Sequence, residues 1–388
     1  MSGQSVVSIA RLAVAAVFFV SGAGFANWVT RIPIVQQKLG LSNGALGVAL
    51  LGTAVGALLA MPTTGWLVAR VGSRSVTKLA VLAYCVTLPL PTLAPNLPLL
   101  TIALAVFGAV YGILDVAMNA QAIAVEQRYR RPIMSSFHGL YSVGGIAGAA
   151  GGGLVASLGV NPIRHLVGAA LLLGLVAVVA SRRLLPTDVD IVTPVPALVV
   201  PKRSLVKLGI VAFCVMLSEG AMADWSAVYL HGTLKMRPGL AAAGYAIFSL
   251  AMAVGRLNGD RLTQVLGPVG MVRLGGTMAA TGLGLSLLIA QPTAALIGFA
   301  CVGVGLSSLV PIVFSAAGNT PGIAPGVALA AVTTTGYGGF LCGPPLIGFA
   351  ADVLSLRIAL GIVVIMCAMS AVLAQTVTPP VVRNKNRD

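Results

Sequence analysis

Long apolar segments recur along the whole chain, and they constrain its fold more than any other feature. Each approaches the roughly 20 residues that an α-helix needs to cross the hydrocarbon core of a bilayer. Of the 388 residues, 57% are hydrophobic and 9% are charged, whereas soluble domains carry about 25% charged residues. Aromatic residues make up only 5%, which is typical of closely packed membrane helices and not of a lipid-facing barrel. The sequence therefore excludes a soluble globular protein and predicts an all-α polytopic membrane protein.

Twelve segments are long and apolar enough to span the membrane. Their approximate limits are 10–34, 43–68, 76–95, 98–125, 133–158, 163–181, 207–231, 239–258, 270–290, 293–316, 326–351 and 357–376. One long polar interruption contains acidic residues and several prolines that cannot continue a helix. We therefore expect an N-terminal six-helix bundle over 1–181, a cytoplasmic linker over 182–206, a C-terminal six-helix bundle over 207–376 and a cytoplasmic tail over 377–388.

Basic residues predict the orientation of these helices. The chain carries 24 Lys and Arg against 9 Asp and Glu, and most basic residues fall in breaks on one side, such as Arg128, Arg182 and Lys207. Cytoplasmic loops carry this excess and meet an anionic leaflet. The net charge of +15 therefore indicates membrane lipids as partners and not nucleic acid. We expect both termini in the cytoplasm and the protein in the cell inner membrane.

Two stretches, at the ends of the first and seventh spans, repeat one another at a constant offset. The matched pairs are Ser21 with Ser218, Asn27 with Asp224, and Trp28 with Trp225. Six spans separate the copies, so both have the same orientation in the membrane. Such a parallel repeat, about an axis along the membrane normal, places a solute site between the two halves near the middle of the bilayer.

The loop after the second span reads Gly65-Trp-Leu-Val-Ala69-Arg70-Val-Gly72-Ser73-Arg74. It resembles the signature G-x-L-x-D-R-x-G-R-R of the major facilitator superfamily, with Ala69 in place of the acid and Ser73 in place of a basic residue. A weaker copy, Gly255-Arg256-Leu-Asn-Gly259-Asp260-Arg261, follows the eighth span. The resemblance implies a gating role at the cytoplasmic helix ends for Arg70, Arg74, Arg256, Asp260 and Arg261. Arg256 and Asp260 are one helical turn apart, so a local ion pair is the alternative.

Spans four and five resemble the fucose-permease branch of that superfamily. Span four reads Gly112-Ile-Leu-Asp115-Val-Ala-Met-Asn119, and span five contains Phe137-His138-Gly139. In that branch an acid followed four residues later by Asn serves as the proton and sugar site, next to a polar residue of span five. Overall, the chain resembles the YbjJ-like bacterial inner-membrane transporters. The resemblance implies that Asp115 and Asn119 bind proton and solute.

Few acids lie within the predicted spans. A charge at the bilayer centre costs about 2.5 to 3.5 kcal/mol on insertion scales, so each of these acids is expected to have a functional or structural role. Asp115 lies deep in span four and shares a helix face with Gly108, Gly112 and Asn119. A carboxyl group in a cavity of low dielectric can bind and release a proton as the cavity opens to either side. His138 can pair with Asp115 across the helix contact; the alternative for His138 is a packing residue. The alternative is an acid held against a basic residue for helix packing.

Span seven adds Glu219 and Asp224, which lie about 140° apart around a helix. They cannot both face one narrow cavity squarely. Asp224 is the repeat partner of Asn27, which suggests a related pair at the outer half of a pathway; the alternative for Asp224 is a helix-end charge. Trp28 and Trp225 are either interfacial anchors or two aromatic platforms of a polar-solute site.

No combination of residues in the sequence is typical of catalysis, a metal site or a bound cofactor. It has three His, and its five Cys lie in apolar runs without CxxC spacing. We therefore do not expect an enzyme. Together with the repeat, the resemblance implies a monomeric secondary active transporter that moves a small polar solute, a sugar or sugar-like metabolite, together with protons. Asp115 is the expected coupling acid. The alternatives are a proton-driven exporter of drugs or metabolites and a membrane sensor that binds a ligand without moving it.

Overall fold

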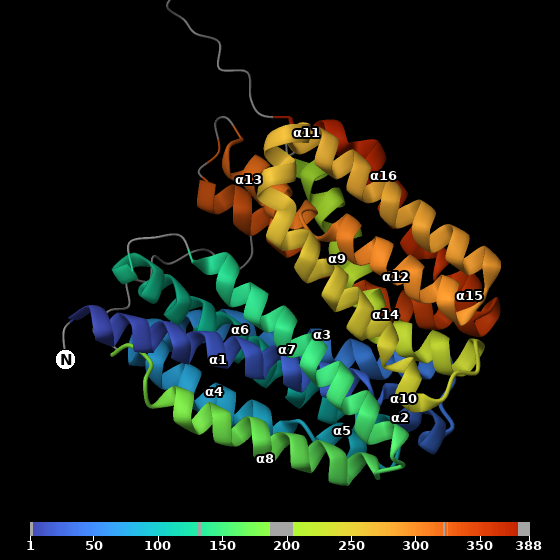
Figure 1. Cartoon of the computed structure of the whole chain (residues 1–388), viewed down its shortest axis with the longest axis horizontal. Coiled ribbons are helices and arrows are strands. Elements are labelled where there is room, and N and C mark those ends of the chain that lie inside the picture. Colours follow the sequence, from blue (N-terminus) through green and yellow to red (C-terminus); the bar gives the residue numbers. More distant parts are fainter. Residues whose placement is uncertain (1–2, 130–132, 187–204, 321–322, 324, 379–388) are drawn as a thin grey trace, which may run out of the picture.

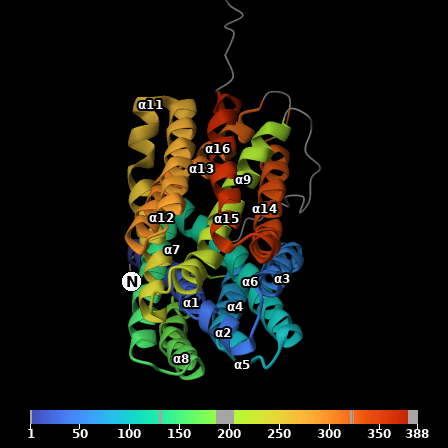
Figure 2. The ribbon, with the colours of Figure 1, turned by 90° about the vertical axis from the view of Figure 1, so that its right-hand side faces the viewer.

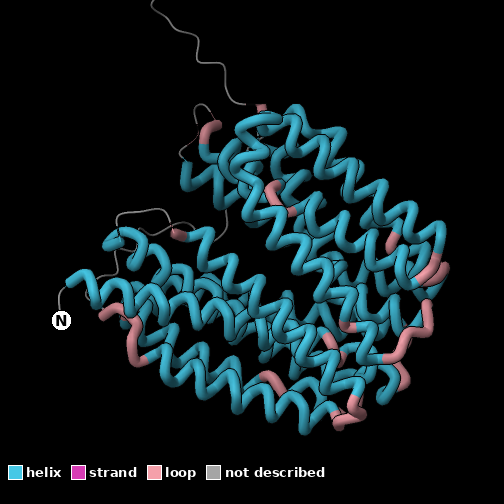
Figure 3. Tube along the Cα trace, viewed as in Figure 1, coloured by secondary structure: helices cyan, strands magenta, loops and turns pink. Residues whose placement is uncertain are grey.

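The computed structural model describes residues 3–129, 133–186, 205–320, 323 and 325–378. Within these ranges it describes all side chains except those of residues 3–5, 62, 65, 66, 69, 135, 260, 325–327, 329 and 330. Every regular element among the described residues is a helix (Figure 3). The prediction of an all-α membrane fold is confirmed.

The N-terminal half contains eight helices. They are α1 (Gly3–Val29), α2 (Ile32–Leu39), α3 (Asn43–Val71), α4 (Ser73–Thr87), α5 (Leu90–Leu93), α6 (Leu97–Tyr129), α7 (Met134–Ser157) and α8 (Pro162–Ser181). The Ser42 hydroxyl accepts the Ala45 N–H at the start of α3, and a side chain in this place stabilises the first turn of a helix. Pro33 lies in the first turn of α2, so the predicted span 10–34 is divided between two helices.

The C-terminal half consists of α-helices with one short π-helix, η3, and one short 3-10 helix, η4. Its elements are α9 (Val206–Val228), η3 (Tyr229–Thr233), α10 (Pro238–Ala241), α11 (Ala243–Ile289), α12 (Pro292–Leu306), α13 (Leu309–Gly318), α14 (Pro325–Val353), α15 (Leu356–Ala359), α16 (Gly361–Val372) and η4 (Leu373–Val377). Among the described residues, 11 helical segments are long and apolar enough to cross a membrane. The 29-residue helix α14 covers the remaining predicted span, 326–351. Most of the predicted linker, 187–204, and the tail from 379 lie outside the described residues.

One helix of the C-terminal half covers two predicted spans. Within α11 the chain turns sharply at Gly267, whose φ of 70° lies in the left-handed region that favours glycine. Pro268 follows, and proline is well accommodated in the first turn of the second arm. The predicted spans 239–258 and 270–290 are therefore two arms of one hairpin, visible beside the label α11 in Figure 1.

The packing of the helices repeats from one half to the other. Helix α1 packs against α7 as α9 packs against α14, and α3 packs against α6 as α11 packs against α12. The two halves form separate groups of helices, from blue to green and from yellow to red (Figure 2). The predicted fold of two parallel six-span repeats is confirmed.

The two halves meet at one end of the molecule and diverge toward the other, where α1 begins (Figure 1). Between the halves, α3 packs against α14, and α7 packs against α10 and α11. The carboxylate of Asp352, in the last turn of α14, accepts hydrogen bonds from the Ser42 hydroxyl at 2.7 Å and the Gly44 N–H at 2.9 Å, where α3 begins. We call the end of the molecule that contains Asp352 the joined end.

Candidate functional site

A cavity of about 290 Å³ lies between the two halves. Its wall is formed by α1, α3, α6 and α7 on one side and by α9, α11 and α14 on the other. Eight aromatic side chains line it: Phe25, Trp28, Tyr111, Tyr141, Tyr245, Phe248, Tyr337 and Phe340. Among the described residues of the wall, the acids and bases are Asp115, Glu219, Asp224 and Arg256. Three carboxylates and one guanidinium therefore face an otherwise apolar and aromatic space.

Glu219 and Arg256 form an ion pair within the C-terminal half. Nη2 of Arg256, on the first arm of α11, lies 3.3 Å from Oε1 of Glu219 on α9. The side chains are 35% exposed for Arg256 and 18% exposed for Glu219, so the pair is only partly withdrawn from solvent. The one guanidinium of the described wall is thus occupied by one of the three carboxylates.

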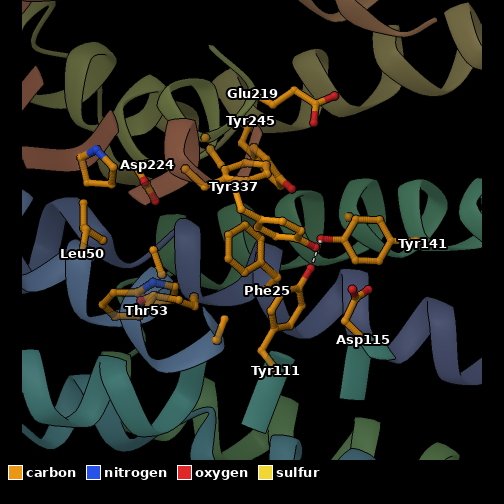
Figure 4. Close-up of a pocket in the computed structure, with 18 of the residues that line it drawn as sticks. Phe25, Leu50, Thr53, Tyr111, Asp115, Tyr141, Glu219, Asp224, Tyr245 and Tyr337 are labelled. Carbon is orange, nitrogen blue, oxygen red and sulfur yellow. Dashed lines mark hydrogen bonds between the residues drawn. The ribbon is translucent and has the colours of Figure 1, made fainter. Parts of the chain in front are cut away.

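The other two carboxylates have no basic partner among the described residues. Asn119, one turn after Asp115 on α6, donates through Nδ2 to the Asp115 main-chain carbonyl at 2.8 Å and to its Oδ1 at 3.3 Å. Within the described part of the chain, Asp224 accepts no hydrogen bond. In the view of Figure 4, Asp224 and Asp115 lie on opposite sides of the central aromatic rings.

Tyrosines connect the helices around Asp115. Tyr111 precedes Asp115 by four residues and shares its helix face, and its hydroxyl oxygen lies 3.0 Å from that of Tyr141 on α7 (Figure 4). The ring of Tyr111 lies 5.8 Å from that of Phe25, which in turn lies 6.3 Å from Tyr245 of the other half. The aromatic wall is therefore continuous across the interface between the halves.

Close packing of α6 against α3 fixes the height of Asp115. At Gly108 and Gly112, a Cβ atom would collide with the main chain of Thr53 and Ala57 on α3. These two glycines therefore admit a neighbouring helix and do not themselves contact the cavity. Thr53 lines the cavity from the same contact, and its hydroxyl has no hydrogen-bond partner among the described residues.

Five residues singled out from the sequence lie in the wall: Trp28, Asp115, Glu219, Asp224 and Arg256. Glu219 and Asp224 both line the cavity despite their angular separation. The reason is that seven helices bound the cavity, which is wide enough to be reached from two directions around α9.

Asn27 lies within the N-terminal half and not in the cavity wall. Its Oδ1 is 2.8 Å from Nε2 of His165, and Nδ1 of His165 accepts the Nε–H of Arg31 at 2.7 Å. Arg31 is only 2% exposed, so this chain of hydrogen bonds joins α1 to α8 in the interior. The expected pair of Asn27 and Asp224 along the pathway is corrected.

His138, Trp225 and Asn119 also lie outside the wall. The His138 ring packs edge-on against Phe18, with centroids 5.2 Å apart, and the expected pairing with Asp115 is not present. Trp225 is fully buried, because it follows Asp224 by one residue and so points about 100° away around the helix. Of the two expected aromatic platforms, only Trp28 lines the cavity. Asn119 contributes to the site through its hydrogen bonds to Asp115.

The predicted gating residues are not one group. Arg70 and Arg261 are exposed, Nη2 of Arg74 donates to the main-chain carbonyl of Arg182 at 3.3 Å, and the side chain of Asp260 lies outside the described residues. Arg256 is corrected from a helix-end residue to a residue of the cavity wall. Its helix continues beyond the predicted limit at 258 to the turn at Gly267, so Arg256 lies within the helix and not at its end.

Several residues of the site were not singled out from the sequence. They are the four tyrosines of the wall, together with Phe25, Phe248 and Phe340. Outside the site, the joined-end acid Asp352 was not singled out either. A signal was present for some of them. Tyr245, Phe248, Met252 and Arg256 recur every three or four residues, so they share one face of α11.

Comparison with known proteins identifies the family. The model of the Major Facilitator Superfamily matches residues 14–339. An uncharacterised MFS-type transporter of Yersinia pestis is 42% identical over 366 residues, which cover 93% of this chain and 94% of that protein. The membrane protein MosC of Rhizobium meliloti is 35% identical over 352 residues, covering 90% of this chain and 85% of that protein.

Solved structures share the fold at low sequence identity. A bacterial homologue of the human lysosomal transporter Spinster, in an inward-facing and unoccupied conformation, has a TM-score of 0.75 at 13% identity and covers 97% of this chain and 98% of its own. The nucleoside transporter NupG has a TM-score of 0.71 at 13% identity and covers 95% of this chain and 98% of its own. From the extent of the family match and of the relatives, the chain belongs to the Major Facilitator Superfamily, as a multi-pass membrane transporter.

Proposed function

We propose that the protein moves a small polar solute through the cavity by alternating access, in symport with protons and with Asp115 as the coupling acid. The observation that supports this most directly is the position of the cavity. It lies between two repeats that are joined at one end and diverge at the other, so rocking of one half against the other would expose it to the two sides in turn.

The distribution of basic residues supports an inward-facing state in the inner membrane. Arg70, Arg128 and Arg182 lie at the ends of α3, α6 and α8, and α1 begins at the diverging end. By the positive-inside rule this end is cytoplasmic, together with both termini. The joined end then faces the outside, and the cavity communicates with the cytoplasm.

The surroundings of Asp115 support its role in proton transfer. Its carboxyl lies on the cavity wall without a basic partner among the described residues. Binding of a proton would therefore neutralise the Asp115 carboxylate. Asn119 fixes the carboxylate by donating to Oδ1. Because an Asn amide can also donate to a neutral carboxyl, the geometry tolerates both states of the acid.

A sugar-like solute fits the polar groups of the wall. Besides the tyrosine hydroxyls, the described wall offers Thr53, Ser142 and Ser249, and aromatic rings provide flat apolar surfaces beside them. In the fucose-permease branch, which spans four and five resemble, the solute is a sugar. The volume of about 290 Å³ lies just below the range of roughly 300–1,000 Å³ for ligand sites, which favours a small solute.

The aromatic wall supports a second candidate, a proton-driven exporter of drugs or metabolites. Eight aromatic rings would also hold an apolar molecule. The two candidates differ in the direction in which the proton gradient drives the solute, and a membrane sensor would bind its ligand with no movement of either.

Proton flux in proteoliposomes tests the proposal. Vesicles that contain the protein and an internal pH dye are mixed with sugars, polyols, amines and hydrophobic drugs, one at a time. We expect a solute-dependent proton flux that Asp115→Asn abolishes. Glu126→Gln is the matched control, because Glu126 accepts the main-chain N–H groups of Ile133 and Met134 away from the cavity and Gln keeps an acceptor oxygen.

The outcomes separate the candidates. Flux that persists in Asp115→Asn would reject this acid as the coupling group and transfer the role to Glu219 or Asp224. Flux only with drugs, in the direction of export, would replace the symporter by the exporter. Binding without flux for every solute would reject transport altogether.

A further inference from the structure

The charges of the cavity wall do not balance. Arg256 is paired with Glu219 at 3.3 Å, and the described wall contains no second base. Asp115 and Asp224 therefore leave two formal negative charges in a space enclosed by apolar and aromatic groups. Unpaired carboxylates are costly in such surroundings, and the cost increases when the two halves close over the cavity and exclude water.

Two positive charges are needed to neutralise the loaded cavity. If one proton binds to Asp115, as the proposed function requires, Asp224 still lacks a partner. Asp115 has the amide of Asn119 on its Oδ1 at 3.3 Å, whereas Asp224 has no hydrogen-bond donor among the described residues. Asp224 is also five residues beyond Glu219 on α9, about 7.5 Å farther along the helix and away from the Arg256 pair.

The aromatic residues of the wall independently favour a cationic solute. The face of an aromatic ring attracts a cation electrostatically, within about 6 Å of the ring centroid. Trp28, the ring type that attracts cations best, is 2% exposed and lines the same cavity as Asp224. An anionic solute would instead meet three carboxylates and one guanidinium that is already paired.

Resting on the proposed function, we propose that the transported solute is a small organic cation, an amine or ammonium compound, whose positive charge is bound by the Asp224 carboxylate against the aromatic wall. The proton on Asp115 and the solute on Asp224 then neutralise the cavity together. The hydroxyl groups of the wall bind the polar remainder of the solute, so a hydroxylated amine fits both features.

Matched probes that differ only in charge test this proposal. Choline is compared with 3,3-dimethylbutan-1-ol, in which carbon replaces the charged nitrogen, and glucosamine is compared with glucose. Binding to the full-length protein in lipid nanodiscs is measured by calorimetric titration. We expect the cation of at least one pair to bind about ten-fold or more tightly than its neutral partner, because it gains both a carboxylate and aromatic faces.

Variants locate the charge. Asp224→Asn is expected to reduce the affinity for the cation to that for its neutral partner, while Asp224→Glu restores most of it. Glu126→Gln, which neutralises an acid outside the cavity, should leave both affinities unchanged. The comparison of the two probes on the wild-type protein needs no variant, so it remains decisive if Asp224→Asn does not fold.

The proposal is overturned if both neutral probes bind as tightly as their cations, if neither cation binds, or if Asp224→Asn keeps the preference for charge. These results are distinct from failure of the proposed function. A proton flux driven by glucose and dependent on Asp115 would uphold the transporter and reject the cation. Binding of a cation through Asp224 without any flux would uphold the cation site and reject transport.

Discussion

The two contacts between the halves at the joined end are built alike in packing and differently in charge. In the contact of α3 with α14, Gly47 lies against the main chain of Pro344. In the contact of α7 with α10, Gly239 lies against the main chain of Gly153. Among the described residues, only the first contact adds a carboxylate, that of Asp352 at the start of α3.

The two contacts therefore hold the halves together by different interactions, one by close packing alone and the other by packing and a charged hydrogen bond. Small residues let helix backbones approach closely, and this packing is insensitive to charge and salt. The Asp352 carboxylate instead meets the partial positive charge and unpaired N–H groups of a helix start, an interaction that water and salt weaken. The Ser42 hydroxyl also accepts the Ala45 N–H at 3.1 Å, so α3 keeps its cap when the halves separate. The charged contact is therefore suited to being broken and remade.

The largest effect is expected from overpacking either contact. Leu at Gly47 or Gly239 would collide with backbone of the facing helix, which typically costs about 1 to 3 kcal/mol and shifts the equilibrium away from the joined state by about 5- to 150-fold. The measurement is the rate at which an impermeant maleimide, added outside, labels a cysteine placed at Thr53 in a variant without native cysteines.

Gly151 provides the control for this comparison. It lies exposed on α7 with no heavy atom near the position of a Cβ, so Gly151→Leu should leave the labelling rate unchanged. If only one of the two buried replacements increases the rate, the contacts are not equivalent in packing.

A smaller effect is expected from removing the cap of α3. Ser42→Ala deletes the acceptor for the Ala45 N–H and should lower the free energy of unfolding by about 1 kcal/mol, measured as a lower Tm. At the other contact, Arg237 precedes α10 without a side-chain hydrogen bond to it, and Arg237→Ala should leave the Tm unchanged. An equal loss in both variants would show that the Ser42 hydroxyl does not stabilise α3.

The negative charge of Asp352 is expected to contribute less to the stability of the joined state. Asp352→Asn removes an interaction worth about 0.3 to 1 kcal/mol, so external labelling at Thr53→Cys should increase by about two- to five-fold. Ser157→Ala, next to Gly239 at the other contact, should not change it. A larger response to Ser157→Ala than to Asp352→Asn would reverse the assignment of charge and packing to the two contacts.

The smallest effect is expected from salt. At about 1 M ionic strength the Debye length falls to about 3 Å, and Asp352 is exposed, so labelling of the wild-type protein should increase, but by less than in Asp352→Asn. In Asp352→Asn, salt should not increase the labelling rate. A salt response of equal size in both proteins would show that Asp352 is not its origin.

The fold was predictable because its signals are local. Apolar runs of membrane length and the repeat of Ser21 to Trp28 in Ser218 to Trp225 depend on no knowledge of contacts. The acids of the cavity were predictable for a similar reason, since Asp115, Glu219 and Asp224 are costly wherever a lipid-facing helix would place them.

The remainder of the site depends on contacts between distant segments. Tyr111 and Tyr337 in an apolar helix look like packing residues until the facing helix is known. Asn27 matches Asp224 in the repeat, yet His165, far along the chain, withdraws it from the cavity. Asp352 lies at a helix end, where an acid is usually solvated, and only its distance to Ser42 and Gly44 shows its role.

The turn at Gly267 has a consequence for the way proteases meet this protein. Arg261 and Arg273 are both exposed near the turn, as trypsin requires, but both lie in helical backbone on arms that reverse without an extended loop. Proteolysis needs an extended, locally unfolded segment. Trypsin should therefore leave the hairpin of α11 intact in the folded protein, and a cut at either arginine would report that the hairpin has unfolded.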